Sequence, residues 1–110
     1  MEVTENGDVT IVRPLSRTYT NPLTVGDLRR ELTHLIQAGR RNILLNLANV
    51  EFVSSMMIGQ LIAIKNEIWG QGGKLILSNI HPQVREVFEI TKLVGVFDIS
   101  ADEADALARF

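Results

Sequence analysis

The chain has 110 residues, the size of one ordinary domain, and we expect a single domain over residues 1–110. Its 11 basic and 13 acidic residues are intermixed and give a net charge of −2, so no nucleic-acid partner is expected. The absence of cysteine excludes disulfides, a thiolate nucleophile and a cysteine-ligated metal. No apolar run is long enough to cross a bilayer and the first residues do not resemble a signal peptide, so we expect a cytoplasmic protein without membrane insertion.

The N-terminal residues predict a β-hairpin. Asn6-Gly7 separates two alternating runs, Met1–Glu5 and Asp8–Arg13, and Asn-Gly is a strong signal for a two-residue hairpin turn. Pro14 ends strand pairing, and the polar stretch from there to residue 21 predicts a loop.

A first helix follows this loop. It begins around Pro22, with Thr24 as the expected cap, and ends at Gly39 in the left-handed conformation. Helical spacing gives it one apolar face, formed by Val25, Leu28, Leu32, Leu35 and Ile36.

The middle of the chain predicts a buried strand that leads into a second helix. The run Ile43–Leu47 is almost continuously apolar, as in a strand covered on both faces of a parallel sheet. The apolar residues of the helix after it recur at Met57, Leu61, Ile64 and Ile68. We expect this helix to end near Trp69, whose side chain is expected to cover the core.

The last third predicts two more strands and two more helices. A second buried strand covers residues 74–78, and Pro82 opens a third helix. A short strand is expected at Val96–Ile99, and the Ser100-to-Glu103 spacing of a capping box predicts a last helix over residues 101–108. The order β-β-α-β-α-β-α-β-α indicates an α/β fold with a mixed, mostly parallel sheet, an antiparallel N-terminal edge strand and about four helices, mainly on one face.

Two adjacent hydroxyls, Ser54 and Ser55, lie where the central strand turns into the second helix. One interpretation is that a serine here caps the helix by accepting a hydrogen bond from a free N–H group of the first turn. The other is that one of them accepts a phosphate, which would face unpaired N–H groups and the positive end of the helix dipole. The residues alone leave both interpretations open.

No other residue pattern indicates catalysis, a metal or a cofactor. His34 and His81 are far apart in the sequence without a supporting ligand spacing, and Glu51 lacks a second carboxylate or a histidine in register. The glycines around Gln71 follow a helix and precede a strand, the reverse of a nucleotide-binding loop. We therefore expect a protein that is not an enzyme and binds no cofactor.

Three separated motifs keep the order and spacing of a known family. They are Ile43-Leu44-Leu45-Asn46-Leu47-Ala48-Asn49-Val50-Glu51-Phe52-Val53-Ser54-Ser55, Gly72-Gly73-Lys74-Leu75, and Pro82–Leu93. Together they resemble the STAS domain, the fold of bacterial anti-sigma factor antagonists, whose central motif is aliphatic-aliphatic-Asp-Leu, a short turn, and then Val-x-Phe-Ile-Asp-Ser-Ser-Gly-Leu-Gly. The resemblance covers nearly the whole chain and is strongest from Ile43 to Phe97.

The resemblance implies a regulatory protein-binding module. Family members of this type bind an anti-sigma factor that is also a serine kinase, lose that interaction when they are phosphorylated, and regain it through a phosphatase. The family's phosphorylated serine falls on Ser55, so Ser55 is the expected site and Ser54 the lesser candidate. The chain departs from the motif where Asn46 and Ser54 replace aspartates and where Met56 and Met57 replace serine and glycine.

The expected partner-binding surface comprises Ser54, Ser55, Met56 and Met57, the exposed side of the following helix and the loop from Tyr19 to Thr24. Met57 is also expected to fill the core, whereas Met56 is expected to be a flexible contact for the partner. The chain is expected to be a monomer or a weak dimer. The alternative is an unphosphorylated STAS scaffold subunit of a transport or stress-signalling complex.

Overall fold

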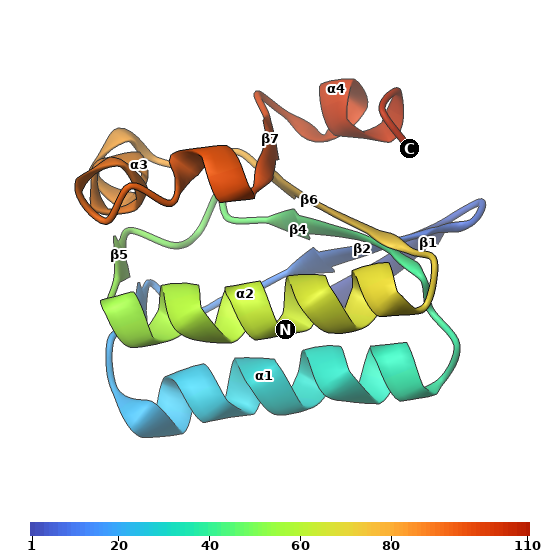
Figure 1. The fold of residues 1–110 in the computed structure, drawn as a ribbon, viewed down its shortest axis with the longest axis horizontal. Helices are drawn as coiled ribbons and strands as arrows, with labels where there is room; N and C mark the ends of the chain where they lie inside the picture. Colours follow the sequence, from blue (N-terminus) through green and yellow to red (C-terminus); the bar gives the residue numbers. More distant parts are fainter.

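The computed structural model describes residues 1–110 (Figure 1). Its strands are β1 (Glu2–Asn6), β2 (Val9–Arg13), β3 (Thr18–Tyr19), β4 (Asn42–Asn46), β5 (Phe52–Val53), β6 (Lys74–Ser78) and β7 (Asp98–Ser100). Its α-helices are α1 (Pro22–Gln37), α2 (Ser55–Gly70), α3 (Pro82–Ile90) and α4 (Glu103–Leu107), and a 3₁₀ helix covers Val94–Val96. None of the helices combines the length and the hydropathy that a membrane crossing requires.

Five strands form the main sheet, in the order β1-β2-β4-β6-β7. β1 and β2 pair antiparallel, and every other neighbouring pair is parallel. β4 is the middle strand, and Ile43, Leu44 and Leu45 are completely buried. The predicted mixed sheet with an antiparallel N-terminal edge is confirmed, and the central strand predicted at residues 43–47 is present one residue earlier, at Asn42–Asn46.

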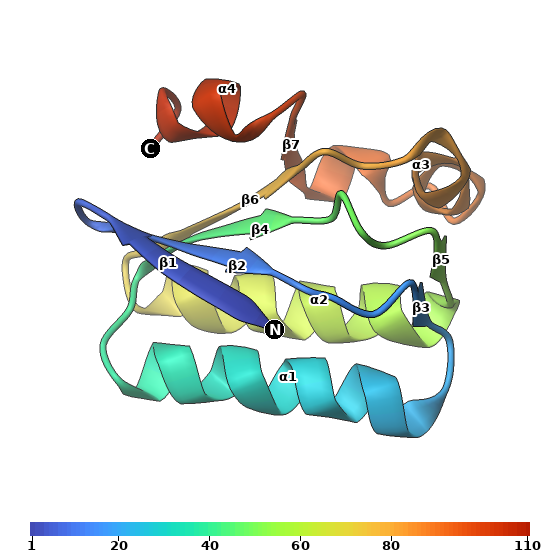
Figure 2. The same cartoon turned by 180° about the vertical axis from the view of Figure 1, so that it is seen from behind.

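The two faces of this sheet are covered unequally. Helices α1 and α2 run side by side in the same direction beneath one face, and α4 lies across the other (Figures 1 and 2). The larger apolar cluster joins the first face to α1, α2 and α3, and includes Leu45, Leu32, Ile64 and Phe88. The smaller cluster lies under α4 and consists of Val9, Ile11, Leu44, Ile76 and Ala106. The predicted concentration of helices on one face therefore holds, with α4 as the exception.

The hairpin turn lies one residue later than the sequence predicted. Asn6 pairs with Val9, so the turn residues are Gly7 and Asp8. Only Gly7 has a positive φ, of 59°. A positive φ at the first central residue alone is the pattern of a type II′ turn, which needs glycine at that position.

The cap of α1 is Asn21, so the prediction of Thr24 was wrong. Asn21 has extended backbone, and its side-chain oxygen accepts a 2.9 Å hydrogen bond from the Thr24 N–H. Pro22 then occupies the first turn, where its missing N–H costs no hydrogen bond. Gly39 follows the helix with φ of 91°, as predicted for its left-handed end.

The C-terminal elements begin later than predicted. The segment from Val94 to Val96 forms a 3₁₀ helix, and the strand begins at Asp98 instead of Val96. The last helix is capped by Asp102, whose side chain accepts a 2.8 Å hydrogen bond from Asp105 N–H, and not by Ser100. Ser100 pairs with Ser78 at the end of the parallel sheet, and this strand pairing prevails over the local capping signal.

Gly73, which joins α2 to β6, allows the chain to pass close to the backbone of Arg41, the residue just before β4. A Cβ atom at this position would lie 1.9 Å from the backbone oxygen of Arg41. The Lys74 N–H donates a 2.9 Å hydrogen bond to that same oxygen. A side chain at position 73 would therefore disrupt the hydrogen bond that joins the first residue of β6 to the residue just before β4.

Candidate functional site

The turn between β5 and α2 is held by a small second sheet that the sequence did not predict. β3 and β5 pair in parallel, with Tyr19 opposite Val53, inside stretches expected to be loop and turn. Directly after β5, the Ser54 N–H donates a 3.1 Å hydrogen bond to the Tyr19 carbonyl oxygen. The predicted neighbourhood of the Tyr19 loop and the serine turn is therefore present in the structure.

Ser54 is the N-cap of α2. Its backbone is extended, and its hydroxyl oxygen accepts a hydrogen bond of 3.3 Å from the Met57 N–H. The same hydroxyl donates a hydrogen bond of 3.4 Å to the Tyr19 carbonyl oxygen. Both the acceptor and the donor capacity of Ser54 are thus used inside the protein.

Ser55 is the first residue of α2, and it differs from Ser54 in its exposure and in its hydrogen bonding. Its side chain is exposed and its hydroxyl makes no hydrogen bond. It also lies at the positive end of a helix of 16 residues, beside N–H groups without helical partners. Of the two serines, Ser55 has the hydroxyl that an enzyme can approach.

The elements that meet at this turn carry exposed apolar side chains. Met56 is 37% exposed in the first turn of α2, Phe52 is exposed in β5, and Leu23 is 81% exposed at the start of α1. Met57 is only 1% exposed and packs in the main core. The expectation that the Met57 side chain contacts a partner is therefore corrected, while its expected place in the core and the exposure of Met56 are confirmed.

The predicted partner surface contained Leu23, within the Tyr19–Thr24 loop, but it did not contain Phe52. Phe52 occupies an aromatic position of the recognised motif, and its exposure depends on the short β5 strand. Leu23 follows a helix-opening proline and belongs to no apolar stripe. Its position off the predicted apolar face of α1 agrees with its exposure.

Charged side chains flank the turn. Arg17, just before β3, forms an ion pair with Glu51, just before β5. The hydrogen bond from Arg17 is the largest cause that lowers the pKa of the Glu51 carboxyl, and a nearby His81 acts in the same direction. His81 in turn contacts the carbonyl oxygen of Ala48 through its Nε2 atom. Tertiary folding thus brings a cation, Arg17, beside a motif that contains no arginine or lysine of its own.

Asn46, which replaces an aspartate of the family motif, belongs to a polar network under α4. Its Nδ2 atom donates a 2.5 Å hydrogen bond to Glu103, and its Oδ1 atom accepts one of 2.9 Å from the Ala48 N–H. Arg13 donates to both carboxylate oxygens of Glu103, at 2.7 and 2.8 Å. The Arg13 hydrogen bond is the main cause that lowers the pKa of the Glu103 carboxyl. An amide fits position 46 because it can donate to this carboxylate.

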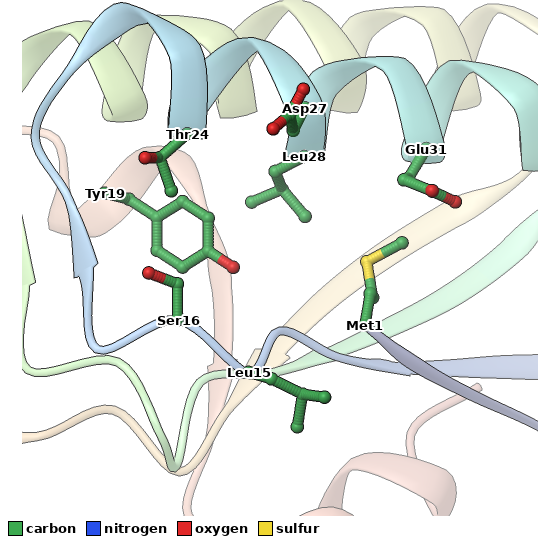
Figure 3. Close-up of a pocket in the computed structure, with 8 residues that line it drawn as sticks. All are labelled: Met1, Leu15, Ser16, Tyr19, Thr24, Asp27, Leu28 and Glu31. Atoms are coloured by element: carbon green, nitrogen blue, oxygen red, sulfur yellow. The ribbon is translucent and has the colours of Figure 1, made fainter.

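A hollow of about 240 Å³ opens beside the turn, between α1 and the N-terminal strands (Figure 3). Tyr19 and Leu28 form part of its wall, and Asp27 and Glu31 reach its rim from α1. Burial is the main cause that raises the pKa of the Tyr19 phenol, which keeps this side chain neutral. The hollow therefore combines apolar walls with an acidic rim.

Trp69 and His34 lie near the C-terminal ends of α2 and α1, away from the serine turn. Trp69 is 77% exposed, so the expectation that it covers the core was wrong. His81 occupies the N-cap position of α3 without a side-chain capping hydrogen bond, and its ring contacts Ala48 instead. No group of three histidine, cysteine, aspartate or glutamate side chains is arranged to hold a metal ion.

Known proteins resemble this chain along nearly its whole length. It is 28% identical over 90 residues to BtrV of Bordetella bronchiseptica, which carries the provisional name of an anti-sigma factor antagonist, and the match covers 82% of this chain and 78% of BtrV. A Thermotoga maritima protein with the same provisional description has a TM-score of 0.87 at 21% identity, over 98% of this chain and 92% of that one. The phosphorylated Bacillus cell fate determinant SpoIIAA has a TM-score of 0.70 at 22% identity, over 98% and 96%.

At these identities the solved structures show a shared fold. The family model described as the STAS domain matches residues 1–106, which include every strand and most of α4. The protein therefore belongs to the STAS domain family.

Proposed function

We propose that this protein is an anti-sigma factor antagonist that is switched by phosphorylation at Ser55. In its unphosphorylated form it binds an anti-sigma factor that is also a serine kinase, and so withholds that factor from its sigma factor. Phosphorylation of Ser55 ends the interaction, and a phosphatase restores it. Membership of the STAS family and similarity to BtrV support this proposal. The protein acts by binding a partner and not by catalysis.

The difference between the two serine hydroxyls carries the proposal. Ser54 is engaged by the Met57 N–H and the Tyr19 carbonyl, so phosphorylation there would break the cap of α2. Ser55 is exposed and makes no hydrogen bond, so a kinase can reach it without unfolding the turn. A phosphate on Ser55 would add about −1.5 to −2 charge at the positive end of α2. The helix dipole favours that charge by about 0.3–1 kcal/mol at an exposed site.

The exposed apolar side chains around Ser55 explain why the phosphate would end binding. A partner that covers the exposed Met56 and Phe52, which lie one and three residues from Ser55 in the chain, would also remove water from the Ser55 hydroxyl. Burying a dianion there without a prepared counter-charge costs several kcal/mol. Arg17 is the nearby cation, and it is already paired with Glu51. The fold would therefore tolerate the phosphate, whereas the docked complex would not.

The test is capture of the partner from the native cell, followed by phosphotransfer in vitro. The full chain serves as bait, and captured proteins are assayed for transfer of phosphate from ATP. Mass spectrometry then locates the phosphate. We expect a bound kinase, phosphate on Ser55, and release of the kinase once the phosphate is present. Stable capture of a partner that never modifies Ser55 would contradict the switch and support the unphosphorylated scaffold.

A further inference from the structure

Trp69 is an exposed aromatic side chain that the proposed switch does not use. It is the only tryptophan of the chain and 77% of it is exposed, in the last turn of α2. The helix separates it from Ser55 by about 21 Å, at about 1.5 Å per residue. Tryptophan is among the residues most enriched at the centres of protein interfaces, because it buries a large apolar area with few rotatable bonds. Its exposure points to a contact outside the serine turn.

The surroundings of Trp69 are positively charged. Together with Lys65 and Lys74 it borders an open hollow of about 170 Å³. Lys65 precedes Trp69 by one helical turn and forms no ion pair. Asp98, which also borders the hollow, is already paired with Arg109. Trp69 is therefore a protruding apolar side chain, and beside it Lys65 carries a positive charge that no ion pair neutralises.

The hollow beside Tyr19 complements the surface around Trp69, because its wall is apolar and its rim is negatively charged. Its apolar wall includes Leu15, Tyr19 and Leu28, and its volume of about 240 Å³ leaves space for an aromatic side chain (Figure 3). Asp27 and Glu31 supply negative charge at the rim, and no lysine or arginine lines it. Glu31 forms no ion pair, while Asp27 pairs with Arg30 on the exposed side of α1.

We propose that Trp69 of one copy docks in the acid-rimmed hollow of a second copy of this chain. The indole would contact Leu28 and Tyr19, and Lys65 would approach Glu31. The charge pattern favours a second copy as occupant, because the same chain supplies both the basic surface around Trp69 and the acidic hollow. An apolar side chain that matches a hollow elsewhere on its own molecule creates a heterologous contact.

The position of the two surfaces determines the kind of assembly. The hollow faces the first half of α1, while Trp69 ends α2, and the two helices run in the same direction (Figure 1). A copy that inserts its Trp69 still offers its own hollow, so the contact can propagate from head to tail. One aromatic side chain buries only about 150–250 Å², well below a standard interface, so association is concentration-dependent. An occupied hollow would also cover the Tyr19–Thr24 loop, which belongs to the proposed partner surface.

Trp69 itself reports on the contact. We expect its fluorescence maximum to move to shorter wavelength as the concentration of the intact protein rises, because the indole leaves water. Analytical ultracentrifugation on the same samples should show a sedimentation coefficient that rises in parallel. An emission maximum and a sedimentation coefficient that both stay constant up to millimolar concentration overturn the proposal. Neither measurement involves a kinase, so this outcome would leave the function proposed for Ser55 unaffected.

A charge exchange identifies the two surfaces. Trp69→Ala, Lys65→Glu and Glu31→Lys should each weaken association at least tenfold, and a mixture of the Lys65→Glu and Glu31→Lys proteins should associate more tightly than either alone. Ile90→Ala, at another exposed apolar residue, should leave association unchanged. Circular dichroism confirms that each variant is folded. Association that survives Glu31→Lys but not Trp69→Ala, or a mixture without recovery, overturns the assignment of the hollow as the docking site.

Discussion

Ser54 is joined twice to Tyr19, a residue 35 positions earlier in the chain. Both its N–H and its hydroxyl donate to the Tyr19 carbonyl oxygen, at 3.1 and 3.4 Å. These bonds fix the entry into α2, and they leave Ser55 as the exposed hydroxyl of the turn. These hydrogen bonds thus give Ser54 a structural role, whereas the hydroxyl of Ser55 is accessible.

Replacing the two serines singly should separate these roles. Ser54→Ala removes the cap of α2 and should lower the free energy of unfolding by about 0.5–2 kcal/mol. Ser55→Ala removes an exposed hydroxyl without a partner and should change it by less than about 0.5 kcal/mol. With the captured kinase, Ser54→Ala should still accept phosphate and Ser55→Ala should not. Denaturant titration and phosphate incorporation measure the two effects, and phosphorylation of Ser55→Ala would reverse the assignment.

Ser55→Glu should keep the fold and lose the partner. The added carboxylate lies at the helix N-terminus, where the dipole tolerates it, so the melting temperature should stay nearly unchanged. Affinity for the partner should fall more than tenfold, equivalent to about 1.4 kcal/mol or more. Gln37→Glu adds the same charge to an exposed position at the end of α1, outside the expected partner surface, and should bind normally. Isothermal titration calorimetry compares them, and equal affinities for both variants would indicate the unphosphorylated scaffold.

Leu45→Ala should show that β4 is the centre of the fold. Leu45 is completely buried in the main cluster, and its truncation should cost on the order of 2–5 kcal/mol. Leu23→Ala removes the same atoms from an exposed position and should stay within about 0.5 kcal/mol of the parent. Chemical denaturation of both variants provides the comparison. A loss below about 1 kcal/mol for Leu45→Ala would contradict its central place.

Glu103 should make the stability of the protein sensitive to acid. Its pKa lies below the ordinary value of 4.5, chiefly through the Arg13 hydrogen bond. A carboxyl with a lowered pKa in the folded state stabilises the protein above its unfolded pKa, and this contribution disappears as the pH falls through the folded pKa. Glu103→Gln should therefore be less stable than the parent at neutral pH, and the difference should shrink below pH 4.5.

The matched control for this pH dependence is Glu86→Gln. Glu86 is exposed on α3 and forms no ion pair, so its replacement should leave the pH profile of the parent unchanged. Asn46→Asp gives a second check, because it would place a carboxylate beside Glu103. It should destabilise the protein at neutral pH, and Glu103→Gln in the same chain should relieve the effect. A difference in unfolding free energy between the parent and Glu103→Gln that does not change with pH would show that Arg13 does not stabilise the protein through the charge of Glu103.

Gly73→Ala should be among the most destabilising alanine substitutions in the chain. Its Cβ would lie 1.9 Å from a backbone oxygen, an overlap that a rotamer change cannot relieve. Gly72→Ala is the matched control, since that position has φ of 79° but open space around the added atom. Gly72→Ala should cost about 1 kcal/mol from backbone strain, and Gly73→Ala clearly more. Thermal unfolding of both variants tests which one loses more stability. Similar losses would show that the backbone at Arg41 can move away from Gly73 easily.

The sequence by itself determined the order and kind of the main elements. The apolar run in β4 and the helical spacing from Met57 to Ile68 are local patterns, and local patterns specify burial within one strand or one helix. The same patterns placed Met57 in the core and a serine at the start of α2. Boundaries were less certain where two nearby residues could cap the same helix, as Asn21 and Asp102 show.

Tertiary structure alone decided which serine hydroxyl is accessible and what surrounds it. The bond from Ser54 to Tyr19 spans 35 positions, and the bonds of Glu103 to Asn46 and Arg13 span 57 and 90. No periodicity encodes such pairs, because they depend on which elements become neighbours in the sheet. The exposure of Trp69 has the same origin, since the indole is solvent-exposed only because no other element packs over the end of α2.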